Sequence, residues 1–160
     1  MMLLFRAICA ASLMLGFYVA HLIDPGTEQQ LRYMPTIALV TAGIVGFGNL
    51  ATRQGWGLIV AVVNGLWAGL ATIVLASVAY VAVHMVAELY AIGRVTFPVF
   101  LETFDATITD LLGQAYEVRN LVVHLVICVT VGVVTEIIHW LLVHVRQVRA
   151  ARRTRQEIEF

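Results

Sequence analysis

The sequence predicts an all-α integral membrane protein, a four-helix bundle with an amphipathic interfacial helix between its third and fourth spans. Hydrophobic residues make up 61% of the 160-residue chain, and its mean hydropathy is +0.89, whereas soluble domains are about 45 to 50% apolar. Four segments also reach the roughly 20 apolar residues that a helix needs to cross a hydrocarbon core about 30 Å thick. A fifth segment has a helical period but carries charges on one side.

The four predicted spans are the apolar runs of residues 3–23, 34–51, 57–83 and 121–145. The first follows the pattern of a signal peptide in that Arg6 lies within its start, but no small-x-small cleavage site follows it. We therefore expect it to be retained as a membrane anchor.

The arginines predict the orientation of these spans. All ten basic residues are arginines, and five of them lie in the last fifteen residues, whereas most carboxylates lie in the other connections. Because arginine near a span end favours the cytoplasm, Arg6, Arg53 and the tail place both termini there. The chain then divides into a transmembrane domain (1–145) and an Arg-rich cytoplasmic tail (146–160). We interpret the tail as a stop-transfer anchor with a helical extension; binding of anionic lipid or nucleic acid is the less favoured alternative.

An amphipathic helix is predicted between the third and fourth spans, over residues 96–112. Its apolar residues recur at steps of three and four: Phe97, Phe100, Leu101, Phe104, Ile108, Leu111 and Leu112. Thr96 suits the N-cap and Pro98 the first turn. The polar side holds Glu102, Asp105 and Asp110. We expect this helix on the outer membrane surface, with its apolar side on lipid or on the bundle; its acidic side either attracts cations or is simply solvated.

Stripes of small residues predict how the spans pack. Helices in lipid associate through close backbone approach, which glycine and alanine permit. The third span has a small residue at every fourth position: Gly57, Ala61, Gly65 and Gly69. The second span repeats this pattern at Ala38, Ala42 and Gly46. The short connection between these two spans predicts that their small faces meet.

Polar residues inside the fourth span predict a lock between helices. His124, Cys128, Gly132, Thr135 and His139 fall in one sector of the helix, with Glu136 beside it. Lipid cannot satisfy such groups, so this side must face protein or water.

Depth then suggests the partners of that polar side. Glu136 lies about as far from Arg146 as Asn64 lies from Arg53, so we predict that Glu136 meets Asn64. The predicted lock consists of Asn64, Gly65, Thr135 and Glu136, with Asn49 nearby.

Histidines and carboxylates at the outer span ends raise a metal hypothesis. The pairs are His21 with Asp24, His84 with Glu88, and Glu117 with His124. Imidazole and carboxylate suit zinc, and His84, Glu88 and His124 are the candidate ligands. Groups that only reach interfacial water are the favoured alternative, so no cofactor is expected.

Other metal and catalytic motifs are missing from the sequence. A di-iron bundle needs two Glu-x-x-His pairs, and only Glu136 and His139 form one inside the spans. The two cysteines form no CxxC motif, and the usual nucleotide, metalloprotease and serine hydrolase motifs are absent.

Three stretches resemble the TrgA family of small alphaproteobacterial inner-membrane proteins, which is named for a genetic link to tellurite resistance. They are RQGWGLIVAVVNGLWAG, AELYAIGRVTFPVFLETFDATI and VGVVTEIIHW, within residues 36–140. The most specific positions are Gly55, Trp56, Asn64, Gly65, Glu88, Arg94, Pro98, Gly132, Thr135 and Glu136. The resemblance implies a four-helix inner-membrane protein and a tellurite phenotype, without a known reaction. This chain is richer in histidine than the family and has a longer tail.

Three functions remain open on these grounds. The preferred one is a non-enzymatic membrane protein for tellurite or other oxyanion stress tolerance, acting as an accessory of another membrane complex. The alternative is a small oligomeric transporter or channel with Glu136, Asn64 and His139 lining the path. The least favoured is an intramembrane enzyme using His84, Glu88 and His124. The expected partners are the lipid bilayer and either further copies of the chain or a larger membrane complex, and not nucleic acid.

Overall fold

The residues that the structure describes fold into five α-helices and one short 3-10 turn. The computed structural model describes residues 2–23, 34–52, 55–93, 96–115 and 118–158, and contains no strand within these ranges. Its elements are α1 (Met2–Ile23), α2 (Met34–Gly48), η1 (Leu50–Thr52), α3 (Leu58–Ile92), α4 (Phe97–Ala115) and α5 (Val118–Ile158). Four candidate membrane spans lie at Leu3–Ile23, Met34–Thr52, Leu58–Ala91 and Leu121–Ala150. The prediction of an all-α chain with four helices able to cross a membrane is confirmed.

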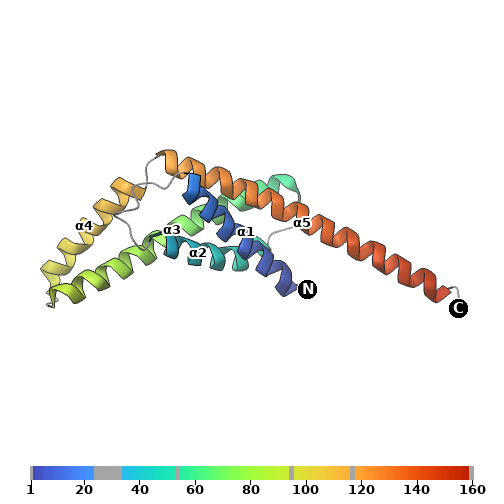
Figure 1. Cartoon of the computed structure of the whole chain (residues 1–160), viewed down its shortest axis with the longest axis horizontal. Helices are drawn as coiled ribbons and strands as arrows, with labels where there is room; N and C mark the ends of the chain where they lie inside the picture. Colours follow the sequence, from blue (N-terminus) through green and yellow to red (C-terminus); the bar gives the residue numbers. More distant parts are fainter. Residues whose placement is uncertain (1, 24–33, 53–54, 94–95, 116–117, 159–160) are drawn as a thin grey trace.

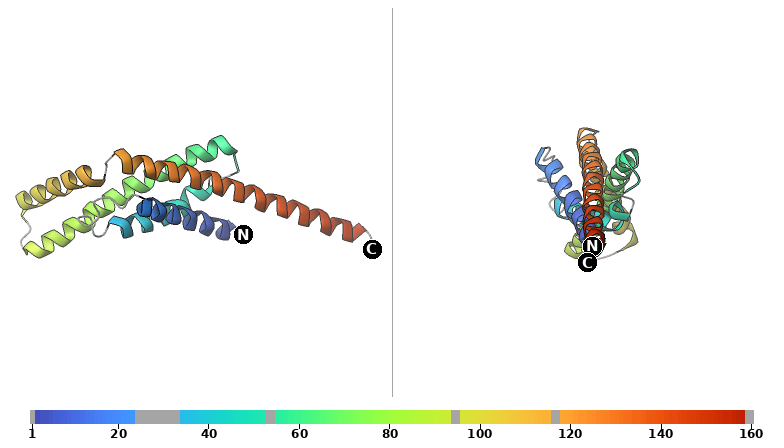
Figure 2. Two further views of the ribbon diagram at one scale, coloured as in Figure 1. Left: turned by 45° about the horizontal axis from the view of Figure 1, so that its top comes forward. Right: turned by 90° about the vertical axis from the view of Figure 1, so that its right-hand side faces the viewer.

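The four spans form an up-down bundle in which α1 and α3 each lie between α2 and α5 (Figures 1 and 2). Neighbouring helices run antiparallel. Gly46 of α2 lies against Cys9 and Ala10 of α1, and the earlier Gly43 lies against Met14 further along α1. Helix α1 begins on the same side of the bundle on which α5 leaves it (Figure 1).

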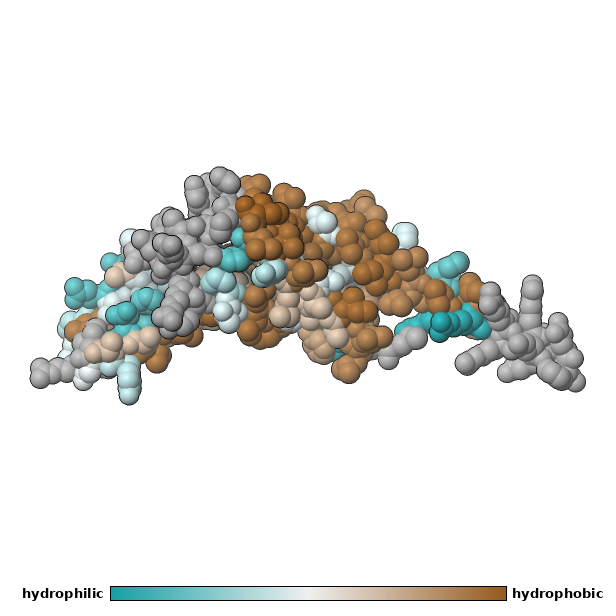
Figure 3. Space-filling model, viewed as in Figure 1, coloured by the Kyte–Doolittle hydropathy of each residue, from teal (hydrophilic) through white to brown (hydrophobic). Residues whose placement is uncertain are grey.

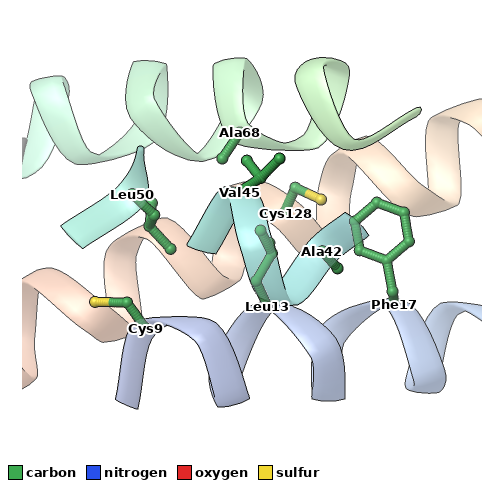
Figure 4. Packing of buried hydrophobic residues seen from close by; sticks show 8 residues of the cluster. All are labelled: Cys9, Leu13, Phe17, Ala42, Val45, Leu50, Ala68 and Cys128. Atoms are coloured by element: carbon green, nitrogen blue, oxygen red, sulfur yellow. The ribbon is translucent and has the colours of Figure 1, made fainter. Parts of the chain in front are cut away.

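Apolar side chains from all four spans, most of them small or medium in size, fill the centre of the bundle (Figure 4). They are Cys9, Leu13 and Phe17 of α1, Ala42 and Val45 of α2, Leu50 of η1, Ala68 of α3 and Cys128 of α5. Larger apolar side chains point outward instead and make a broad hydrophobic belt, with hydrophilic residues toward both ends (Figure 3). An apolar exterior is stable in contact with lipid tails, so the belt fits the assignment of these helices as spans.

Helix α3 is longer than the sequence predicted. The predicted span stops at Val83, before His84 and Glu88, but the helix continues to Ile92 because no helix-breaking residue precedes Gly93. Gly93 ends it in the left-handed conformation (φ 67°), with its N–H donating to the Leu89 carbonyl.

Helix α4 then returns beside the outer part of α3 (Figure 1). Its bounds agree closely with the predicted amphipathic helix, and the Phe100 N–H donates to the Thr96 carbonyl, as expected for an N-cap at Thr96. Leu111 is buried against Tyr80 of α3, close to Met34 and Ile37 of α2.

Helix α5 extends far past the bundle (Figure 1). It passes the predicted domain boundary at residue 145 without interruption and stays helical to Ile158. Arg146 and Arg149 are exposed on this extension.

Candidate functional site at the Glu136 end of the bundle

Glu136 is buried among the helices and holds the loop that precedes α3. Its side chain is 2% exposed. The Gly55 N–H donates to Glu136 Oε2 at 2.8 Å, and the Gly57 N–H donates to Oε1 at 3.0 Å. Hydrogen bonds between backbone N–H groups and a carboxylate are stronger than neutral ones. Both oxygens of this buried carboxylate are therefore used in joining α5 to the α2–α3 connection.

The backbone of this loop explains why it takes a carboxylate. Gly55 and Gly57 have φ angles of 95° and 105°, which L residues with a Cβ rarely adopt. Gly57 is the N-cap of α3 and has no side-chain cap of its own. The first N–H groups of a helix lack partners within the helix, and its N-terminus carries a partial positive charge. Glu136 supplies from another helix the negative acceptor that a capping side chain would otherwise provide.

Aromatic contacts tie α1 to the same end of the bundle. The His139 ring meets the Phe5 ring edge-on, with centroids 5.2 Å apart. The guanidinium of Arg6 lies 5.7 Å from the centre of the Phe47 ring, a cation–π distance. His139 also borders Gly55, since a Cβ placed on this glycine would lie 2.9 Å from His139 Nε2. The start of α1, the end of α2 and the part of α5 around His139 thus meet near the loop. Arg53, which the topology prediction used, lies outside the described residues.

Of the predicted lock residues, Gly65 lies at the contact between α3 and α5, and Glu136 accepts hydrogen bonds from loop glycines that the sequence did not predict as its partners. Asn64 is buried, and Thr135 is fully buried with its hydroxyl donating to the carbonyls of Val131 and Gly132. The bonds from Glu136 go to glycines about two helical turns before Asn64. Depth matching between helices did not predict these two bonds, because it considered only residues within the spans and not the loop at their end. The predicted meeting of Glu136 with Asn64 stays a prediction.

The small-residue stripe of α3 faces α5, so the predicted meeting of the small faces of α2 and α3 is wrong. A Cβ on Gly65 would lie 2.5 Å from the Cys128 carbonyl oxygen, and one on Gly132 would lie 2.9 Å from Gly65 Cα. The backbones of α3 and α5 thus touch at these two glycines. A Cβ on Gly69 would meet the Cys128 side chain at 2.7 Å.

The remaining small residues also differ from the prediction. Ala61 is buried, and its carbonyl oxygen borders Gly132. Gly57 is a loop residue with nothing within 4 Å of its Cβ position. Gly46 of α2 packs on α1 instead of α3. A stripe of small residues predicts a close approach but not its partner, and α5 offers a second stripe of its own.

The outer histidines pack against aromatic rings. His84 contacts Tyr80 one turn earlier on α3, and His124 contacts Phe17 of α1, with ring centroids 5.5 and 5.3 Å apart. Glu88 is exposed. Among the described residues, no group of three His, Cys, Asp or Glu is placed to hold a metal ion, so His84, Glu88 and His124 do not form the metal site that the sequence suggested. Asp24 and Glu117 lie outside the described residues.

Alanine substitutions in the loop should separate backbone strain from side-chain contact. Gly57→Ala is expected to destabilise the fold by about 1 to 3 kcal/mol through its backbone conformation alone (φ 105°, ψ 168°), because its Cβ would meet no atom. Gly55→Ala should cost more, since its Cβ also approaches His139. Thermal unfolding in detergent measures both. His139→Ala should remove only the difference between them; equal losses in Gly55→Ala and Gly57→Ala would contradict this geometry.

Comparisons of the chain with models of protein families, with curated protein sequences and with solved structures find no match. The resemblance to the TrgA family therefore remains a prediction from the sequence. What the structure adds is the arrangement of the intramembrane polar residues: a buried carboxylate bonded to a glycine loop, beside a glycine seam between α3 and α5.

Proposed function

We propose that the protein is a non-enzymatic inner-membrane protein of the TrgA type, which supports a larger membrane complex and thereby contributes to tellurite or other oxyanion stress tolerance. In this proposal both termini lie in the cytoplasm. The predicted spans place Arg6 and the arginines of the tail on the same side of the membrane, and arginine near span ends favours the cytoplasmic side. The family and the phenotype rest on the sequence resemblance. The role as a structural accessory rests on the site.

One observation carries the structural part of the proposal: both carboxylate oxygens of Glu136 are bonded to the loop before α3. A carboxylate that carries protons or ions across a membrane needs a site where it can exchange partners with water or substrate. Both oxygens of Glu136 instead accept hydrogen bonds from Gly55 and Gly57 while the side chain is almost fully buried. This arrangement supports a rigid bundle that presents its surfaces to partners.

The transporter alternative is less well supported by the same geometry. It places Glu136, Asn64 and His139 along a path formed by several copies of the chain, and within one copy the backbone contact at Gly65 and Gly132 closes the space between α3 and α5. A path would have to form between copies of the chain. Flux into proteoliposomes that disappears in Glu136→Gln would favour this alternative over the accessory role.

Helix α4 in this proposal lies at the outer surface of the membrane. Its residues Thr107 and Leu111 are buried, whereas Phe97, Phe100 and Leu101 remain exposed beside the acidic side of the helix. An apolar stripe next to a polar face is the arrangement of helices that lie in the interface plane. The lipid headgroup layer would cover the exposed phenylalanines.

Deletion of the gene tests the proposed function. We expect the deletion strain to become more sensitive to tellurite and the wild-type gene to restore growth. Tagged protein isolated from native membranes should also bring down a defined membrane partner in a fixed ratio. A deletion strain with unchanged tellurite tolerance would refute the phenotype, and a protein that purifies alone yet supports flux would refute the accessory role.

A further inference from the structure

We propose that the loop of Gly55, Trp56 and Gly57 is a membrane-surface anchor, in which Glu136 holds the Trp56 side chain in the lipid headgroup layer. The two hydrogen bonds of Glu136 go to the residues on either side of Trp56. Trp56 itself is 79% exposed, so the bonds fix the backbone while the indole points away from the bundle. Neither the accessory role nor the transporter alternative uses this feature.

The position of Trp56 along the chain places it at a bilayer surface. One candidate span ends at Thr52 and the next begins at Leu58, so Trp56 lies between the ends of two spans. Trp140, 55% exposed, is one turn beyond Glu136 on α5 and therefore near the same level. Arg6 and Phe47 pack together at this end as well.

Tryptophan and arginine at this level indicate that the loop lies against lipid headgroups. Tryptophan is enriched at membrane interfaces because its ring is apolar while its N–H can bond to water or headgroups. Exposed Arg146 lies a short distance beyond Trp140 on α5 and suits anionic phosphate groups. This end of the bundle therefore combines apolar rings with positive charge, which suits the headgroup layer of a bilayer.

The buried carboxylate gives the anchor its fixed geometry. Glycines with positive φ allow a tight loop but leave it many conformations when nothing restrains it. Glu136 removes this freedom at two points that flank the indole. A loop held in this way keeps the tryptophan at one depth, so that the bundle resists tilting and vertical movement.

Fluorescence quenching tests the anchor. A variant with Trp56 as its single tryptophan (Trp67→Phe and Trp140→Phe) is placed in vesicles of phosphatidylethanolamine and phosphatidylglycerol. Some vesicles carry bromine near the headgroup end of the acyl chains and others near the methyl end. We expect stronger quenching by the shallow bromines than by the deep ones, and weak quenching by aqueous acrylamide.

Glu136→Gln and Glu136→Asp in the same background should weaken this depth preference and increase acrylamide quenching. The matched control keeps Trp140 as the only tryptophan (Trp56→Phe and Trp67→Phe), and its quenching should not change if the variants remain folded. A wild-type loop that acrylamide quenches as strongly as free tryptophan, or that bromolipids do not quench, would overturn the proposal. So would a depth preference that both Glu136 variants retain, or shielding of Trp56 that occurs only with a protein partner bound. All of these outcomes are independent of the tellurite phenotype.

Discussion

Replacing Glu136 with alanine is expected to lower the free energy of unfolding by about 2 to 3 kcal/mol, as for the loss of a charged hydrogen-bonding group with buried partners. The substitution leaves the N–H groups of Gly55 and Gly57 without their acceptor and opens a cavity at a side chain that is 2% exposed. Glu136→Gln keeps one acceptor oxygen at nearly the same volume, so about 1 kcal/mol should be lost. Reversible unfolding in mixed detergent measures both values.

The matched control for this prediction is His144→Ala. His144 is exposed on the same helix, two turns beyond Glu136, and its loss should change stability by less than about 0.5 kcal/mol. If Glu136→Ala unfolds at the same point as His144→Ala, the carboxylate does not hold the loop.

Alanine in the seam between α3 and α5 should have the other large effect. Gly132→Ala and Gly65→Ala each place a methyl group within 2.5 Å of a carbonyl oxygen on the facing helix. Backbone atoms cannot rotate away, so the helices must separate, at a cost of about 3 kcal/mol. Gly48→Ala is the control, because no atom lies within 4 Å of its Cβ position.

The seam also predicts which of these losses can be rescued. The nearest obstacles to Gly69→Ala are the sulfur and Cβ of Cys128, whereas Gly65→Ala meets the backbone at Cys128 and Val129. Cys128→Gly should therefore restore part of the stability of Gly69→Ala and none of that of Gly65→Ala. Double-mutant cycles measure this coupling directly. Equal rescue of both variants would show that the two glycines do not face different parts of α5.

Hydropathy and length were sufficient to predict the spans because the requirement for about 20 apolar residues is local. The same reasoning ended the third span at Val83, although the helix continues to Ile92. The period of the apolar residues predicted α4 well, since capping at Thr96 and first-turn geometry at Pro98 are also local properties. It did not predict which side of α4 would meet α3, where Thr107 and Leu111 are buried in place of the phenylalanines.

Contacts between helices depend on information that local patterns do not contain. The stripes of small residues on α2 and α3 correctly predicted that these helices approach a neighbour closely. The neighbour was wrong, because the glycines of α2 lie against α1 and those of α3 lie against α5. The Glu136 contact was missed for a different reason. Two glycines around Trp56 at the start of a helix indicate free N–H groups that need an acceptor, and a carboxylate in the facing span could have been assigned to them.

Hydrogen exchange of the glycine amides tests most directly the claim that the buried carboxylate of Glu136 holds the loop. Protein labelled with ¹⁵N only at glycine allows the amides of Gly55, Gly57, Gly65 and Gly132 to be followed by NMR in detergent. We predict that Gly55 and Gly57 are protected in the wild type and both lose protection in Glu136→Ala, which has no acceptor oxygen, while Gly65 and Gly132 remain protected. Fast exchange of Gly55 and Gly57 in the wild type, or rates that do not change in Glu136→Ala, would contradict the account.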